Sequence, residues 1–196
     1  MLRAMQRAAL IAITAVAACG GSQGIHHGNQ ASEIRNVDWQ NRTYDLGALG
    51  AVAVHGGNAD FAITDDGKAA ETGTSQGNYH IDLPLFADLD GDGVEDVVIS
   101  SVTSTGGTGH FSQIELFTIR DHKVVALGAI PGGDRGDGGI RALHLDGRTV
   151  VVERNVLAEG DGACCASQFQ VERWTWKNGQ MTEDTAARAS PTPIPD

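Results

Sequence analysis

The stretch from residue 139 to residue 157, GIRALHLDGRTVVVERNVL, predicts the fold most clearly. Two runs rich in apolar and β-branched residues, 139–146 and 149–157, lie on either side of the turn Asp146-Gly147-Arg148. Runs of this length and composition are typical of strands, and a short link containing Gly is typical of a hairpin. This stretch therefore predicts two antiparallel strands joined by a tight turn.

The same pattern extends in both directions along the chain. Arg120-Asp121-His122 and Lys177-Asn178-Gly179 are further hairpin links, and Asn-Gly is a strong type I′ turn signal. After the N-terminal apolar segment, no window longer than ten residues has a convincing 3.6-residue apolar period. We therefore expect an all-β antiparallel meander, packed as a sandwich or a partly closed barrel. Its expected strands are residues 37–46, 50–55, 60–63, 78–87, 94–103, 112–120, 123–130, 139–146, 149–157 and 168–177.

The first 18 residues follow the plan of an export signal. Arg3 and Arg7 supply positive charge, and an apolar run of residues 8–18 follows, too short to span a bilayer. The run ends in Val16-Ala17-Ala18-Cys19, which resembles the lipobox of bacterial lipoproteins. The resemblance implies cleavage before Cys19 and attachment of diacylglycerol to its thiol, so the partner of this residue would be membrane lipid. The alternative is an ordinary signal peptide cut at the same bond.

The expected organisation has four parts. Residues 1–18 form a cleaved signal helix, residues 19–36 a lipidated flexible tether, residues 37–184 a single β domain, and residues 185–196 a disordered Pro-rich tail. Gly20 follows the lipidated cysteine where some inner-membrane lipoproteins have Asp. We therefore expect a place in the bacterial cell envelope, with the outer membrane favoured.

The charge of the chain restricts its partners. The formal net charge is −11, and it becomes −13 once Arg3 and Arg7 leave with the signal. A surface of this sign repels nucleic acid and anionic headgroups, so we expect no nucleic-acid partner. It favours cations.

An aspartate-rich loop is the strongest internal signal. Residues 88–96, DLDGDGVED, fit the spacing D-x-D-x-D-G-x-x-D. Ca²⁺ prefers six or more oxygen ligands, and alternating acids in a curled loop can supply them. The spacing predicts a structural calcium site with ligands from Asp88, Asp90, Asp92, the Val94 carbonyl and Asp96. The alternative is a solvated acidic turn.

The loop is not an EF-hand, because Ile99 occupies the position that requires a bidentate Glu. It resembles the calcium loops of FG-GAP repeats, in which a strand leaves the loop. A propeller of such repeats needs several copies, and the chain has this one.

Cys164 and Cys165 are adjacent, and with Cys19 lipidated they are the remaining thiols. Exported proteins meet an oxidising compartment, which favours a vicinal disulfide between them. Two alternatives stay open at this point: reduced or intermolecularly bonded cysteines, and a soft-metal or redox site.

Four segments together resemble a group of uncharacterised bacterial exported proteins. They are residues 37–44 (VDWQNRTY), the aspartate-rich loop, residues 132–141 (GGDRGDGGIR), and Cys164-Cys165 followed by Trp174-Thr175-Trp176. The group usually has Pro after the cysteines, where this chain has Ala166. The resemblance implies an architecture and brings no activity with it.

No segment predicts a reaction. Ser75 lies in a G-x-S-x-G pattern, but a second copy around Ser22 shows how readily a glycine-rich chain produces it, and the preceding residues are too polar for a nucleophile elbow. The sequence therefore predicts a non-enzymatic binding or envelope-maintenance domain, with an envelope protein or glycan as its partner. The alternative is an envelope hydrolase acting on glycan or peptide, with Asp134 or Asp137 as catalysts.

Overall fold

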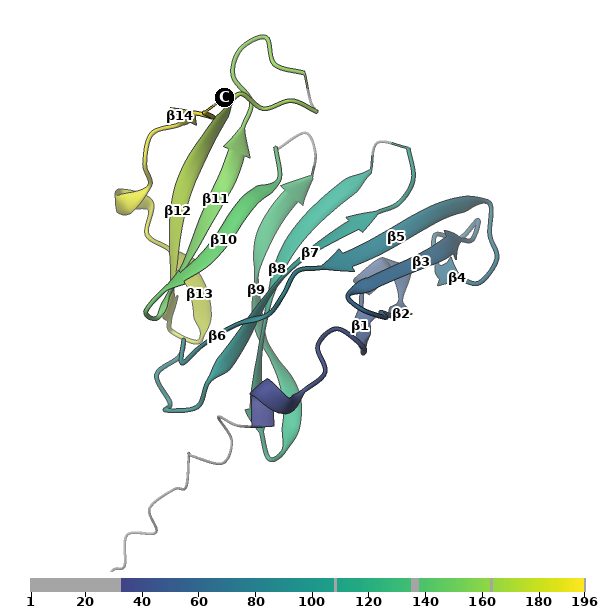
Figure 1. Cartoon of the computed structure of the whole chain (residues 1–196), viewed down its shortest axis with the longest axis horizontal. Coiled ribbons are helices and arrows are strands. Elements are labelled where there is room, and N and C mark those ends of the chain that lie inside the picture. Colours follow the sequence, from purple (N-terminus) through teal and green to yellow (C-terminus); the bar gives the residue numbers. More distant parts are fainter. Residues whose placement is uncertain (1–32, 108, 135–137, 163, 196) are drawn as a thin grey trace, which may run out of the picture.

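Short antiparallel strands joined by tight turns make up nearly all of the regular structure (Figure 1). The structure is a computed structural model, and it describes residues 33–107, 109–134, 138–162 and 164–195. The predicted signal, the lipidation site Cys19 and most of the tether lie outside the described residues, as do residues 135–137 with Asp137. Within the described ranges, no helix is long and apolar enough to cross a membrane.

The elements follow one another along the chain with few long connections. The strands are β1 (Thr43–Asp45), β2 (Ala51–Ala53), β3 (Asn58–Ile63), β4 (Ala69–Ala70), β5 (Ser75–Ile81), β6 (Leu85–Ala87), β7 (Asp96–Ser104), β8 (His110–Arg120), β9 (Lys123–Asp134), β10 (Ile140–Asp146), β11 (Thr149–Val156), β12 (Gln168–Lys177), β13 (Gln180–Glu183) and β14 (Thr192–Pro193). Two 3₁₀ turns, η1 (Gly47–Leu49) and η3 (Thr185–Ala187), complete the list.

The strands form two main sheets and one small hairpin. The large sheet has the order β4-β3-β5-β7-β8-β9, with β6 also paired to β7, and it curls into a half-barrel. The small sheet has the order β10-β11-β12-β13, with β14 also paired to β12, and β1 pairs with β2. All of these pairings are antiparallel. The prediction of an all-β antiparallel fold is therefore confirmed.

The hairpin turns have the backbone that their residues predict. Asn178 and Gly179 have φ angles of 53° and 82° between β12 and β13, and Asp121 and His122 have φ angles of 50° and 60° between β8 and β9. Positive φ at both central residues is the signature of a type I′ turn, whose twist matches that of the flanking strands.

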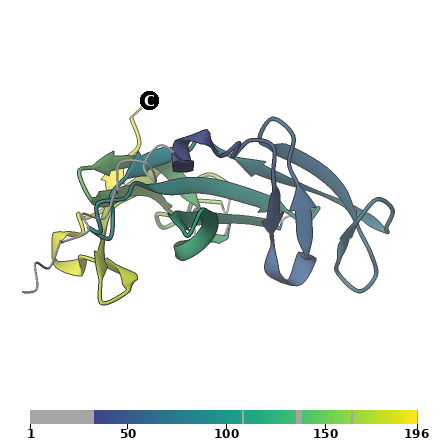
Figure 2. The ribbon, with the colours of Figure 1, turned by 90° about the horizontal axis from the view of Figure 1, so that it is seen from below.

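Strand β7 is buried on both faces because it lies between two hydrophobic cores. Val97 and Ile99 belong to the N-terminal core, together with Ile34, Trp39, Tyr44, Val52, Val54, Phe61, Ile63, Tyr79, Ile81 and Ile119. Val98 points the other way, into the inter-sheet core with Leu89, Ile114, Leu116, Ile130, Val150 and Val152. Successive side chains of a strand alternate between faces, so this apolar run serves both cores. Figure 2 shows the N-terminal segment and the β1–β2 hairpin against the large sheet.

Two of the predicted strands differ from the structure. The predicted strand 78–87 is two strands, because Pro84 cannot donate to the ladder. Both parts still follow the same edge of β7, since Ile81 pairs with Ser101 and Leu85 with Val98. In the segment 37–46, only β1 is a strand, and the residues before it form turns.

The packed domain includes residues 33–36, which the sequence predicts as the end of the tether. These residues form a helical turn, and Ile34 is fully buried in the N-terminal core. The indole Nε1 of Trp39 donates a hydrogen bond of 3.0 Å to the Ile34 carbonyl. The isolated Ile in a polar segment gave no periodic signal, and only packing against distant strands shows its role.

The C-terminal segment lies along β12, although its composition predicts a disordered tail. β14 pairs with β12, with Thr192 opposite Phe169 and Pro193 opposite Gln168. The Ile194 amide donates to the Ser167 carbonyl at 2.9 Å. β13 covers only the end of β12, so the rest of that edge is open for backbone pairing. Backbone hydrogen bonds need no apolar side chains, and Pro is tolerated in an edge strand.

Candidate metal centre

The aspartate-rich loop connects β6 to β7 and closes their antiparallel pair. Ala87, the last residue of β6, lies opposite Asp96, the first residue of β7. The side chains of Leu89 and Val94 anchor the loop, with exposed fractions of 1% and 2%. The chain therefore leaves and re-enters the sheet at fixed points, and the loop has little freedom to spread.

Three of the predicted ligands come together in this loop. Asp88, Asp90 and Asp96 each place a carboxylate oxygen within 4.8 Å of the other two. Asp88 and Asp90 are half-buried, whereas Asp96 is fully buried. This group could hold a metal ion, and the prediction that a metal-binding cluster lies in this segment is supported to that extent.

Backbone amides hold the carboxylates in place. The amide of Gly91 donates to Asp88 Oδ1 at 2.7 Å, and the amide of Gly93 donates to Asp88 Oδ2 at 3.3 Å. The Leu89 amide donates to Asp96 Oδ2 at 2.9 Å. Gly91 and Gly93 have φ angles of 81° and 86°, which side chains with a Cβ rarely adopt. The two glycines thus permit the tight curl that brings the acids together.

Asp96 has an unmet interaction. Its Oδ1 atom is buried and forms no hydrogen bond of normal geometry, and neither does Oγ1 of Thr118, the buried hydroxyl that lies near the carboxylate. Burial raises the pKa of Asp96 from 3.8 to about 6, against the Leu89 amide and the Thr118 side chain, which both lower it. An ionised carboxylate in such a place is unfavourable unless a cation compensates its charge.

The nearby arginines contact the outside of the loop. Arg120 Nη2 lies 3.7 Å from Asp90 Oδ2, and Arg148 Nη2 donates to the Leu89 carbonyl at 3.1 Å. Burial nevertheless raises the pKa of Asp90, and the neighbouring Asp92 and Asp88 raise it further. The arginines therefore do not fully offset the negative charge gathered here.

The other two predicted ligands are placed differently. Asp92 lies outside the group of three, and its Oδ1 accepts a hydrogen bond of 2.8 Å from the Val94 amide. Its carboxylate thus shapes the turn. The roles of Asp92 and of the Val94 carbonyl as ligands stay predictions.

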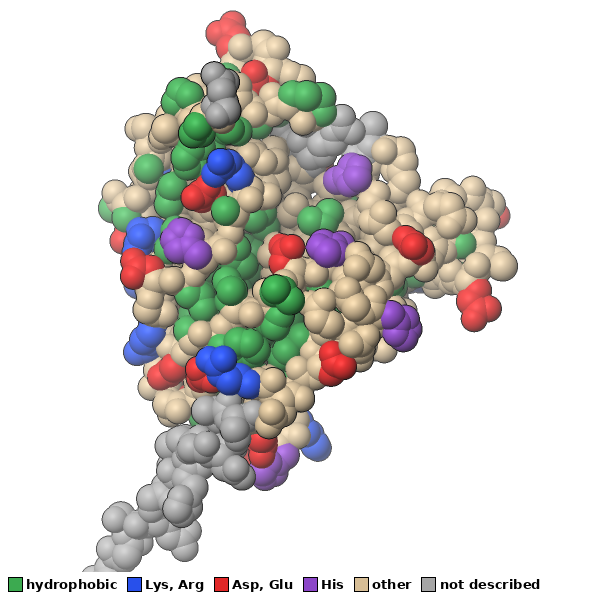
Figure 3. Space-filling view, viewed as in Figure 1, with side chains coloured by type: hydrophobic (Ala, Val, Ile, Leu, Met, Phe, Trp, Pro, Cys, Tyr) green, Lys and Arg blue, Asp and Glu red, His purple; other side chains and the backbone are tan. Residues whose placement is uncertain are grey.

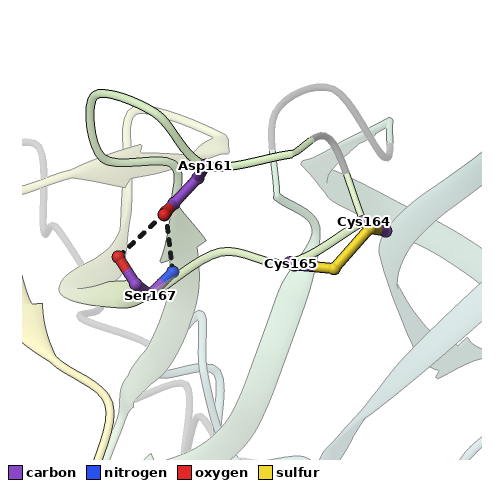
Figure 4. Close-up of a disulfide and its surroundings, with 4 residues drawn as sticks. All are labelled: Asp161, Cys164, Cys165 and Ser167. Atoms are coloured by element: carbon purple, nitrogen blue, oxygen red, sulfur yellow. Dashed lines mark hydrogen bonds between the residues drawn. A yellow bond between two sulfur atoms is a disulfide. The ribbon is translucent and has the colours of Figure 1, made fainter.

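The adjacent cysteines lie in the loop between β11 and β12. Cys164 and Cys165 are both exposed, and their sulfur atoms lie at disulfide-bonding distance across Cα atoms 3.8 Å apart (Figure 4). The amide of Cys165 donates to the Gly162 carbonyl at 2.8 Å. The structure thus shows the vicinal pair that the sequence favours, and it links no distant parts of the chain.

Asp161 closes this cysteine loop. Its Oδ2 accepts hydrogen bonds from the Ser167 amide at 2.8 Å, the Ala158 amide at 2.8 Å and the Ser167 hydroxyl at 2.9 Å (Figure 4). These bonds, with that from the Ser167 amide the strongest, lower the pKa of Asp161. The sequence does not single out Asp161, because its role as a hydrogen-bond acceptor depends on the conformation of the loop.

An arginine–glutamate pair is the main buried ion pair that sequence reasoning missed. Glu172 is 4% exposed and accepts hydrogen bonds from Arg154 Nε at 2.8 Å and Nη2 at 3.0 Å, and from Trp174 Nε1 at 3.1 Å. The Arg154 guanidinium also donates to the carbonyls of Pro131 and Gly132 on β9. The pair therefore fastens the small sheet to the large one. Nothing in its spacing, 18 residues apart on two strands, indicated this contact.

The two described residues considered for catalysis lie at the ends of strands. Ser75 begins β5, so the strand-to-helix turn of a nucleophile elbow is absent at that position. Asp134 ends β9.

On the face seen in Figure 3, acidic, basic and histidine side chains are scattered, and hydrophobic side chains gather near the middle.

Comparison with protein families, curated proteins and solved structures finds no match for the chain. The resemblances to bacterial lipoproteins, FG-GAP loops and the group of exported proteins therefore stay predictions.

Proposed function

We propose that this protein is a lipid-anchored cell-envelope domain whose fold is stabilised by Ca²⁺ and whose role is non-enzymatic binding or maintenance of the envelope. The observation that carries the calcium part is the burial of Asp96 with an unpartnered Oδ1, within reach of Asp88 and Asp90. A divalent cation supplies the charge that this group lacks.

The donor set favours calcium over other divalent ions. The group offers carboxylate oxygens only, which suit hard cations rather than Zn²⁺ or Cu²⁺. Ca²⁺ accepts six to eight oxygens in irregular geometry, whereas Mg²⁺ demands a near-ideal octahedron. Extracellular calcium modules bind with dissociation constants of about 10⁻⁴–10⁻³ M, which is the range expected for a loop with three clustered acids.

The position of the loop supports a structural role for the proposed ion. Arg120 ends β8 and reaches the loop through Asp90, while Arg148 reaches it from the turn between β10 and β11 through the Leu89 carbonyl. The loop thus lies where the large sheet and the small sheet meet. An ion that fixes it would stabilise the contact between the two sheets.

The anchor part of the proposal rests on the sequence at Cys19. The described chain enters the domain beside the calcium loop, because Arg35 donates to both carboxylate oxygens of Glu95 at 2.6 and 2.7 Å. Palmitate labelling of the producing bacterium tests the anchor. Wild type should incorporate label and Cys19→Ala should not, and equal labelling of the two would rule out lipidation at this residue.

Thermal unfolding of the mature chain tests the calcium part. Raising Ca²⁺ from chelator-treated buffer to 5 mM should raise Tm by about 3–6 °C, since binding at about 5–50 times Kd stabilises by about 1–2 kcal/mol. Asp90→Asn should abolish most of the shift. Asp60→Asn, an exposed acid on β3, is the matched control and should keep it. An unchanged Tm in the wild type would overturn the proposal.

A further inference from the structure

A cavity of about 520 Å³ lies on the large sheet, on the side of the N-terminal core. Its floor comes from β5, β7 and β8, neighbours in the sheet (Figure 1), and its roof comes from the end of β1 and η1. Ligand pockets of proteins commonly enclose about 300–1,000 Å³. This cavity is separate from the aspartate-rich loop, which lies at the other end of β7.

The floor of the cavity changes character along the strands. On this face, β7 presents Val97 and Ile99 to the N-terminal core and then Ser101 and Thr103 to the cavity. On β8, Ile119 and Phe117 face the N-terminal core, and Glu115 and Gln113 face the cavity. Strand positions that face a filled core are normally apolar. Polar side chains at these positions indicate a surface that meets a polar group.

The polar end of the cavity is negative. Glu115 and Asp45 are its charged lining residues, and none of the described lining residues is Lys, Arg or His. The Tyr79 hydroxyl donates to Glu115 Oε2 at 3.0 Å. Burial is the main factor that raises the pKa of Glu115, the hydrogen bond from Tyr79 and the charge of Arg42 oppose it, and Asp45 adds a smaller increase. Arg42 does not line the cavity, and its guanidinium carbon lies over the Trp39 ring at 4.7 Å.

Part of the lining is apolar and partly open. Leu46, Leu49 and Phe111 line it, and Phe111 is 48% exposed. Apolar side chains of this kind suit a hydrocarbon body. An aromatic ring also attracts a neighbouring cation through its face.

We propose that this cavity binds a small organic ammonium compound with an apolar body. The ammonium group lies between Glu115 and Asp45, and the body packs against Phe111, Leu46 and Leu49. Coulomb attraction in a partly buried site favours the cation, and the negative surface of the protein favours its approach. This inference rests on the proposed binding role and gives it a ligand class.

Titration of the mature chain in 5 mM Ca²⁺ with three probes of similar shape tests the proposal. The probes are 2-phenylethylammonium, neutral 2-phenylethanol and anionic 3-phenylpropionate, followed by calorimetry and by amide shifts of Ser101, Thr103 and Gln113. The ammonium probe should bind at least tenfold more tightly than either of the others. Equal affinity for the three probes, tighter binding of the neutral or the anionic probe, or no shift at these amides would overturn the ligand class.

Two matched variants assign the binding to the cavity. Glu115→Gln, which keeps the shape, should weaken binding of 2-phenylethylammonium at least tenfold, and Asp60→Asn, which removes one exposed charge elsewhere, should not. Equal effects of the two would mean attraction by net charge alone and would overturn the site. Because the titration runs in saturating Ca²⁺ and the thermal test uses no amine, failure of this inference and failure of the calcium proposal are distinguishable.

Discussion

Two buried carboxylates, Glu172 in the small sheet and Asp96 at the start of β7, have opposite surroundings. Both are almost inaccessible, with exposed fractions of 4% and 0%. Glu172 accepts hydrogen bonds from the guanidinium of Arg154 and from the indole of Trp174. Asp96 accepts backbone amides on one oxygen only, and its other oxygen has no partner.

The charge of Glu172 is compensated by residues of the chain, whereas the charge of Asp96 is not. Burial opposes ionisation of Glu172, but the hydrogen bonds and charge of Arg154 outweigh it, so its pKa is lowered. Burial of Asp96 is not outweighed, and its pKa rises to about 6. Buried charge is tolerated when it is paired or bound to a metal. Glu172 therefore needs nothing from outside the chain, whereas Asp96 favours a bound cation.

Arg154→Met should produce the largest effect, because it removes the guanidinium that donates to Glu172 and leaves this buried carboxylate with the hydrogen bond from the Trp174 indole. Removal of one partner of a buried pair costs about 3–5 kcal/mol, and here the β9 carbonyls also lose their donor. Urea unfolding measures the loss. Arg173→Met removes the exposed pair with Asp146 and is the control, with an expected loss under about 1 kcal/mol. Similar losses in the two variants would contradict the assigned difference.

The metal-free domain should lose stability as pH rises through 6. Between pH 3.8 and about 6 the folded state keeps a proton on Asp96 that the unfolded state releases, so the free energy of unfolding falls as pH increases. The loss is at most about 3 kcal/mol. Urea unfolding in chelator-treated buffer at pH 5, 6.5 and 8 measures it.

The lowered pKa of Glu172 has the opposite sign. Its stabilisation is present above the ordinary glutamate value of 4.5 and is lost at more acidic pH, so it causes no loss near pH 6. The raised pKa values of Asp90 and Glu115 act in the same direction as that of Asp96. Saturating Ca²⁺ should flatten the fall between pH 5 and pH 8. A fall that persists unchanged in Ca²⁺ would separate Asp96 from the metal.

Asp96→Asn should stabilise the metal-free domain by about 1–2 kcal/mol at pH 8, because it removes a buried charge and keeps an acceptor for the Leu89 amide. Its new amide group can donate to Thr118 Oγ1, which lies near this carboxylate and forms no hydrogen bond of normal geometry. The same variant should lose the Tm response to Ca²⁺. Calorimetry with and without chelator measures both, and destabilisation without metal would contradict the view of Asp96 as an incomplete contact.

Deletion of residues 190–196 should produce the smallest effect, about 1 kcal/mol or less, because it removes only exposed edge pairing along β12. Amide exchange should rise at Phe169 and stay unchanged at Val152. This variant also tests whether Glu172, on the same strand, keeps its protection without the tail.

Local sequence chemistry predicted the parts of the molecule that depend on neighbours in the chain. Asn178 and Gly179 specify a type I′ turn by their own backbone preferences, and the β-branched run of β7 specifies a strand. The aspartate spacing indicated a metal-binding loop because alternate acids in a curled segment must come close. Pro84, as a missing donor, could have shown the break between β5 and β6.

Other features depend on residues far apart in the sequence. Arg154 and Glu172 are ordinary charged residues until β11 and β12 pair and bury them together. Ile34 has no apolar neighbours in the sequence, and the tail after Thr185 has the composition of a disordered segment. Their contacts form only because other parts of the fold provide an apolar surface or an unpaired strand edge.

The sequence by itself determined the all-β class, the turns, the adjacent cysteines and the acids at 88–96, because each follows from short-range backbone geometry or ligand spacing. The tertiary structure decided which buried carboxylate has its charge compensated by an arginine. It placed Arg154 against Glu172, left Asp96 Oδ1 without a partner, and opened a polar cavity over β7 and β8. Burial and long-range pairing set the energy of a charge, and neither can be read from the residues next to it.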